Sequence, residues 1–144
     1  MPNTTTKNNP YSAYRQTSVA TASPEKLLLM LYDGAIRFLN QARASMEQDD
    51  FEAANKWLGK LQDIFMELNM TLDMNQGEVA YNLRKLYEFY QKEVLMANVE
   101  KSIDRLQPVE DFLRTFRETW VEAIKIVNRE HIHTQTGERE NADY

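Results

Sequence analysis

Apolar residues recur at alternating spacings of mostly four and three in four separate segments of this chain. Such spacing places the residues on one side of an α-helix, and a helix of this kind needs partners to bury that side. Four such helices joined by short turns fold most simply as an antiparallel bundle in which sequence neighbours pack together. We therefore predict an all-α fold, an antiparallel four-helix bundle. The four ladders are Leu28, Tyr32, Ala35, Leu39, Ala42 and Met46; Phe51, Ala54, Leu58, Leu61, Phe65, Leu68 and Leu72; Ala80, Leu83, Tyr87, Tyr90, Val94 and Ala97; and Val109, Leu113, Phe116, Trp120, Ala123 and Val127.

Capping residues and helix breakers set the expected boundaries of these helices. Ser23 can accept a hydrogen bond from a free amide of the first turn, and Pro24 suits the first helical position, so the first helix is expected to begin here. Asp50 is a similar cap for the second helix. Gly77 marks the turn before the third helix, and Pro108 opens the fourth helix or kinks its first turns.

The 144 residues, of which 42% are hydrophobic, suffice for one domain with a sizeable core. Residues 1–22 are rich in Asn, Thr, Ser and Gln and are predicted to form a flexible N-terminal arm. Residues 23–128 are predicted to form the bundle, and residues 129–144, which lack apolar periodicity, to form a disordered tail. Tyr11 and Tyr14 in the arm would share one face of a helical turn. Either they dock into a groove on the bundle or they remain unattached.

Charge and composition exclude several classes of function. A net charge of -5 and a pI near 5.1 argue against nucleic acid as a partner, because neutralising phosphates requires clustered Lys and Arg. The chain has no cysteine, so disulfides, thiolate metal sites and cysteine nucleophiles are excluded. The N-terminus does not resemble a signal peptide, and no apolar run approaches the roughly 18 residues of a membrane span. We expect a cytosolic, cytoplasmic protein without membrane insertion.

The residues offer little for catalysis. Di-iron and haem bundles need inward-facing histidines or other ligands, yet His131 and His133 both lie in the predicted tail. This His-x-His pair is expected to be two polar residues rather than a metal site. The glycines are scattered, and no Ser or Thr has a visible base partner. We therefore predict no cofactor, no metal and no enzyme activity, with an undetected enzyme as the least favoured option.

Apolar side chains remain once the core ladders are assigned. Helical geometry turns Gly59, Met66, Met70 and Met74 of the second helix, and Tyr81, Phe89, Met96 and Val99 of the third, away from the core. The back of the fourth helix is instead mostly charged, with Glu110, Asp111, Arg114, Glu118, Glu122 and Lys125. Methionine is flexible and polarizable, so a methionine row beside aromatic rings suits a surface that accepts an amphipathic segment. The alternative is that several of these side chains fold back into the core.

Gly34 lies inside the first helix, where glycine costs about 1 kcal/mol relative to alanine. It therefore marks either a close approach of another helix or part of a groove for a partner. The flanks of the first ladder, including Leu31, are apolar as well. Our predicted partner-binding residues are Tyr11, Tyr14, Leu31, Gly34, Met66, Met70, Tyr81, Phe89 and Met96.

Three short blocks in the arm and first helix are distinctive: Asn-Pro-Tyr-Ser-Ala-Tyr at 9–14, Thr-Ala-Ser-Pro-Glu-Lys-Leu at 21–27 and Met-Leu-Tyr-Asp-Gly-Ala at 30–35. With Ala97-Asn98 and Trp120 they resemble FliS, the family of flagellin-specific export chaperones of bacterial flagella, over residues 9–127. The resemblance implies a cytoplasmic bundle that binds the disordered C-terminal segment of flagellin and prevents premature polymerisation before export. It also implies an N-terminal arm that covers part of the binding surface, at the position of Tyr11 and Tyr14.

The partners implied by the resemblance are the flagellin C-terminal region and, as further candidates, other flagellar regulators or export-gate proteins. The protein itself would be a monomer or a weak homodimer. The rival hypothesis is a structural one, in which the same apolar flanks pair bundles into a homo-oligomer that has no client.

Overall fold

A computed structural model describes residues 23–142 of the chain, with side chains up to residue 132. Four α-helices follow one another: α3 (Pro24–Glu47), α4 (Phe51–Met70), α5 (Glu78–Glu100) and α6 (Leu106–Ala142). A short 3-10 helix, η1 (Met74–Gln76), lies between α4 and α5, and residues 23–142 contain no strand. The predicted all-α four-helix bundle is confirmed. The predicted arm, with Tyr11 and Tyr14, lies outside the described residues.

The helices begin where their capping residues predict. The Ser23 hydroxyl accepts a hydrogen bond from the amide of Lys26 at 3.2 Å, and the Asp50 carboxylate accepts one from the amide of Ala53 at 3.1 Å. Gly77 precedes α5 with a φ of 70°, a conformation that favours glycine. Pro108 lies in the first turn of α6, where its missing amide removes no helical hydrogen bond.

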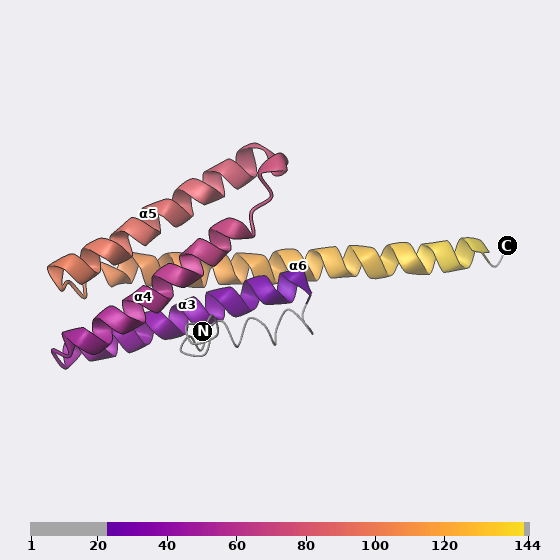
Figure 1. Cartoon of the computed structure of the whole chain (residues 1–144). Coiled ribbons are helices and arrows are strands. Elements are labelled where there is room, and N and C mark those ends of the chain that lie inside the picture. Colours follow the sequence, from indigo (N-terminus) through magenta and orange to yellow (C-terminus); the bar gives the residue numbers. More distant parts are fainter. Residues whose placement is uncertain (1–22, 143–144) are drawn as a thin grey trace, which may run out of the picture.

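The four helices pack unequally. Helix α3 lies along α4 and also contacts α6, while α5 packs mainly on α4 and only sparingly on α6. Figure 1 shows the reason: α5 and α6 are close near the turn that joins them, and α5 angles away from α6 toward η1. The bundle is therefore closed at the end that holds this turn and more open at the other end.

The core follows the predicted ladders except at Phe51, which is 36% exposed, and on α6 after Leu113, where the ladder residue Val127 is 57% exposed. Its centre holds Tyr32 and Tyr87, which are fully buried and whose hydroxyls share a hydrogen bond of 2.7 Å. Burial raises the pKa of both phenols, so both remain neutral and able to donate. Around them, buried side chains come from all four helices, including Leu39, Ala42, Leu58, Leu61, Phe65, Leu68, Leu83, Val94, Ala97, Leu106, Val109 and Leu113.

Ion pairs join α6 to α3, and they include Glu110, which the sequence analysis placed on the solvated side of its helix. Glu110, expected on the solvated back of its helix, is buried, and its carboxylate lies 2.8 Å from Arg43 of α3 and 3.0 Å from Arg114. Burial alone would raise the pKa of this carboxyl, but hydrogen bonds from Arg43 and Arg114 outweigh burial and lower it. Arg117 of α6 pairs with Asp33 of α3 in the same way.

The C-terminal segment also differs from the expectation. The lack of apolar periodicity after Asn128 predicted a disordered tail, whereas α6 continues as a helix to Ala142 and extends past the other helices (Figure 1). Apolar periodicity reports burial, and a helix can persist without it once nucleated. A packed preceding segment supplies that costly nucleus, and each added residue then gains a backbone hydrogen bond.

Candidate partner-binding surfaces

The outer side of α4 and α5 carries a row of exposed apolar side chains. Met66 and Met70 are one turn apart on α4, Met74 follows at the start of η1, and Met70 is 71% exposed. Tyr81 and Leu95 of α5 are about half exposed on the side of α5 that neighbours α4. We call these five residues the methionine face. Each of its five large apolar side chains is at least 46% exposed, and exposed apolar side chains that gather on one side of a protein often mark a binding site.

Hydrogen bonds between α4 and α5 fix the register of this face. Asn98 donates to Asn55 at 2.7 Å, and the Gln62 amide donates to the backbone carbonyl of Gln91 at 2.9 Å. Toward η1 the two helices enclose a shallow hollow of about 210 Å³. Its lining combines two methionines with polar groups, namely Asn69, Met70, Met74, Arg84 and Glu88.

A chain of aromatic rings runs from α5 to α6. Phe89, which is 55% exposed, meets Tyr90 edge-on with ring centroids 5.0 Å apart. Tyr90 stacks on Phe112 of α6 at 4.2 Å, and Phe112 lies 4.6 Å from Phe116. The exposed Phe89 ring is thus held at the end of a packed aromatic row rather than on a mobile side chain.

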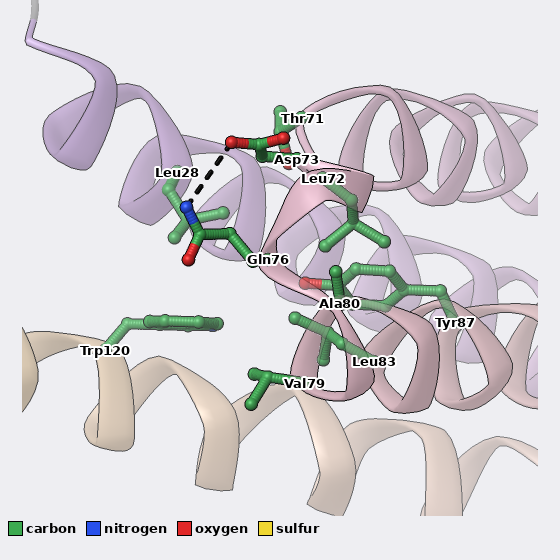
Figure 2. A pocket seen from close by; sticks show the side chains of 10 residues that line it. All are labelled: Leu28, Thr71, Leu72, Asp73, Gln76, Val79, Ala80, Leu83, Tyr87 and Trp120. Atoms are coloured by element: carbon green, nitrogen blue, oxygen red, sulfur yellow. Dashed lines mark hydrogen bonds between the residues drawn. The ribbon is translucent and has the colours of Figure 1, made fainter.

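A cleft of about 180 Å³ opens where α5 diverges from α6. Figure 2 shows Trp120 of α6 facing Val79 and Leu83 of α5 across this space, with Leu28 of α3 on a third side. The buried Tyr87 forms part of its lining, and Gln76 lies near its opening, where its amide donates to Asp73 at 3.4 Å. The lining is mostly apolar, so the cleft suits a hydrophobic side chain of another segment.

Five of the predicted partner-binding residues have exposed or half-buried side chains. Met66, Met70, Tyr81 and Phe89 are at least half exposed, whereas Met96 is half-buried. Exposure makes these side chains available to a partner, and their role in binding stays a prediction.

Two further residues do not lie on the surface. Leu31 is only 3% exposed and belongs to the core, because it faces α4 rather than solvent. Gly34 is also buried, and a Cβ at this position would lie 3.1 Å from Cδ1 of Ile64. Of the two interpretations of Gly34, the structure supports close packing of α3 on α4.

Sequence analysis missed part of this surface. Leu28 and Trp120 fall on their helical ladders and were assigned to the core, yet both line the cleft. Val79, Leu86 and Leu95 are exposed beside the third ladder. Helical wheels could have placed these three residues outside the seam, but no pattern in the sequence indicates that α5 diverges from α6.

Two other properties bear on function. Among residues 23–132, no group of three or more His, Cys, Asp or Glu side chains is arranged to hold a metal ion. In the described part of the chain, no helix combines the length and the apolar character that crossing a membrane requires.

Comparison with known proteins identifies the family. The family model of the flagellar protein FliS matches residues 7–127. The flagellar secretion chaperone FliS of Bacillus subtilis is 39% identical over 117 residues, which cover 81% of this chain and 87% of that protein. The same chaperone of Campylobacter jejuni is 35% identical, covering 80% and 91%, and that of Salmonella typhimurium is 37% identical, covering 75% and 84%. The chain therefore belongs to the FliS family of flagellar secretion chaperones.

Proposed function

We propose that this chaperone binds the disordered C-terminal segment of flagellin in the cytosol, prevents its premature polymerisation and keeps it competent for flagellar export. The observations that support this proposal best are the methionine face and the exposed Phe89 ring at the end of the aromatic row on α5. A segment that assembles into a filament through apolar contacts needs a cover for them before assembly, and this surface offers one. The role is binding, and the proposal assigns no catalytic step to any residue.

The chemistry of the methionine face suits a client that folds as it binds. Methionine side chains are unbranched and polarizable, so they adjust to the shape of an amphipathic helix. Ordering a disordered segment costs roughly 2 to 5 kcal/mol or more of the gross interaction energy. Affinity would therefore depend on a few apolar anchors, and the bound client would gain helical structure.

The sharpest test is a double substitution, Met70→Glu with Phe89→Glu. Both side chains are more than half exposed, so the melting temperature should change little while affinity for a flagellin C-terminal peptide falls by about tenfold or more. A matched control is Val127→Glu with Ile132→Glu, which adds the same charge at exposed apolar positions of α6. Calorimetric titration should give normal affinity for the control. Equal loss in both variants would refute the proposed surface.

The arm is proposed to cover apolar surface before the client arrives. Tyr11 and Tyr14 would supply two rings, and the cleft beside Leu28 and Trp120 lies near the start of α3, where the arm joins the bundle. Tyr11→Ala with Tyr14→Ala should leave the bundle folded and alter flagellin affinity. Unchanged calorimetric binding would exclude this covering role.

Sedimentation of the pure protein tests the rival hypothesis of a homo-oligomer without a client, since a dimer that persists at all concentrations would favour self-assembly over client binding.

A further inference from the structure

A second surface feature lies on the side of α4 that faces α3. Phe38 and Trp57 stack across the two helices with ring centroids 5.8 Å apart. Three cations lie over these rings: the Arg37 guanidinium is 5.5 Å from the Phe38 centroid, and the Lys56 and Lys60 ammonium groups are 5.7 Å and 4.8 Å from the Trp57 centroid. We call these five residues the basic aromatic patch.

The three cations of the patch have no acidic partner among the described residues. Most arginines elsewhere on the bundle do have one, because Arg43, Arg84, Arg105, Arg114 and Arg117 all form ion pairs with carboxylates. The protein as a whole carries a net charge of -5, so carboxylates are plentiful. Among the described residues Lys125 is the only lysine in an ion pair, so of the three cations only Arg37 differs from most residues of its type, and the patch is distinguished by three cations gathered over two stacked rings.

Lys56 and Lys60 are one helical turn apart and repel each other. Partial burial, followed by the neighbouring charge of Lys56, lowers the pKa of Lys60. The aromatic rings restrain the aliphatic chains of Lys56 and Lys60, so the ammonium groups are already positioned. Binding a ligand would therefore cost less conformational entropy. An anion placed between the two lysines would relieve their repulsion.

We propose that the basic aromatic patch binds an acidic helical segment of a partner protein. Carboxylates at positions i and i+4 of such a helix have the same single-turn spacing as Lys56 and Lys60, and Arg37 on α3 would contact a third acidic group. Nucleic acid fits less well. Phe38 is only 6% exposed and the lysines already cover Trp57, so bases have no free ring to stack on.

This surface is distinct from the proposed flagellin surface. The patch lies between α3 and α4, whereas Met70 lines a hollow with Arg84 and Glu88 of α5. The two sides of α4 could therefore hold a client and an acidic partner at once. The inference does not depend on the proposed client, because the two surfaces share no residue.

The test is a nuclear magnetic resonance titration of the full chain with an alanine-based helical peptide that carries Glu pairs at i and i+4. A peptide with Gln in place of Glu is the reference probe. At low salt the indole N–H of Trp57 should shift on addition of the Glu peptide, while that of Trp120 should not. The shift should diminish as salt rises from 0.01 M to 0.15 M, where the Debye length falls from about 30 Å to about 8 Å.

Two variants make the test specific. Lys56→Gln with Lys60→Gln should weaken peptide binding by about tenfold. Lys26→Gln with Lys125→Gln removes the same charge at exposed positions of α3 and α6, outside both surfaces, and should leave the affinity nearly unchanged. Flagellin-peptide affinity should be equal in both variants and the wild type, which separates this inference from the proposed function.

Three outcomes would overturn the inference. The first is an unmoved Trp57 resonance, and the second is equal weakening in the two lysine variants, which would indicate attraction without a site. The third is tighter binding of a 20-nucleotide polyuridylate probe than of the Glu peptide, with the same dependence on Lys56 and Lys60. That result would assign the patch to nucleic acid.

Discussion

The two ends of this bundle are built from the same helices but differ in how completely they close. At the end near the α5–α6 turn, Met46, Val94, Ala97, Leu106 and Val109 are all buried. At the opposite end, Leu28 and Trp120 are only half-buried and face the cleft. The comparison indicates that apolar periodicity alone does not decide whether a ladder residue is buried, because the neighbouring helix must also be close enough to cover it.

Local contacts explain why the first end closes. The turn between α5 and α6 is short, and Arg105 within it pairs with Glu100 at 2.6 Å and with Glu93 at 3.2 Å. Small residues such as Ala42 and Ala97 also let the helices approach there. At the open end, α5 follows a longer connection that includes η1, and it reaches α6 less closely. The short turn between α5 and α6 therefore lies at the closed end of the bundle, and the longer connection between α4 and α5 lies at the open end.

Leucine truncation in the middle of α3 and at its open end gives the largest expected contrast. Leu39→Ala should lower the free energy of unfolding by about 2 to 5 kcal/mol, because it leaves a cavity at a fully buried site. Leu28→Ala should cost clearly less, since its side chain is already partly solvated beside the cleft. Chemical denaturation of both variants measures the difference. Equal losses would mean that Leu28 and Leu39 are equally packed in solution.

Alanine substitution of two helical glycines should have a smaller effect. Nothing lies within 4 Å of a Cβ at exposed Gly59, so Gly59→Ala should raise the free energy of unfolding by up to about 1 kcal/mol. At Gly34 the added methyl would press on Ile64, which is fully buried, and the gain in helix propensity should be cancelled. Thermal melts of both variants provide the comparison. Stabilisation by Gly34→Ala equal to that by Gly59→Ala would argue against close packing of α3 on α4.

The smallest expected effect concerns Glu110 and depends on pH. Its folded pKa lies below the ordinary value of 4.5, so its contribution to stability is present above that value and is lost as the pH falls through the folded pKa. Glu110→Gln should therefore lower stability by about 0.5 kcal/mol at pH 7 and by progressively less in acid. Urea unfolding of both proteins between pH 7 and pH 3 measures this convergence. A stability difference that stays constant from pH 7 to pH 3 would show that the ion pairs of Glu110 do not cause it.

Much of the fold could be predicted from the sequence because it depends on local signals. The caps at Ser23 and Asp50 lie where expected, and most ladder residues are buried. Which residues lie on the surface was harder to predict from the sequence. Leu31 and Gly34 lie on a flank that α4 covers, and Glu110 lies on a face that Arg43 reaches from α3. These outcomes depend on which helix occupies each flank, and residue periodicity carries no information about that.

The central claim is that the methionine face receives the flagellin C-terminal segment, and the seven methionines of the chain allow a direct test. With methyl-labelled methionine, a flagellin C-terminal peptide should shift or broaden the resonances of Met66, Met70 and Met74. Met46, which is 3% exposed at the closed end, should stay unchanged and serve as the internal control. Binding of the peptide with all three of those resonances unmoved would contradict the account.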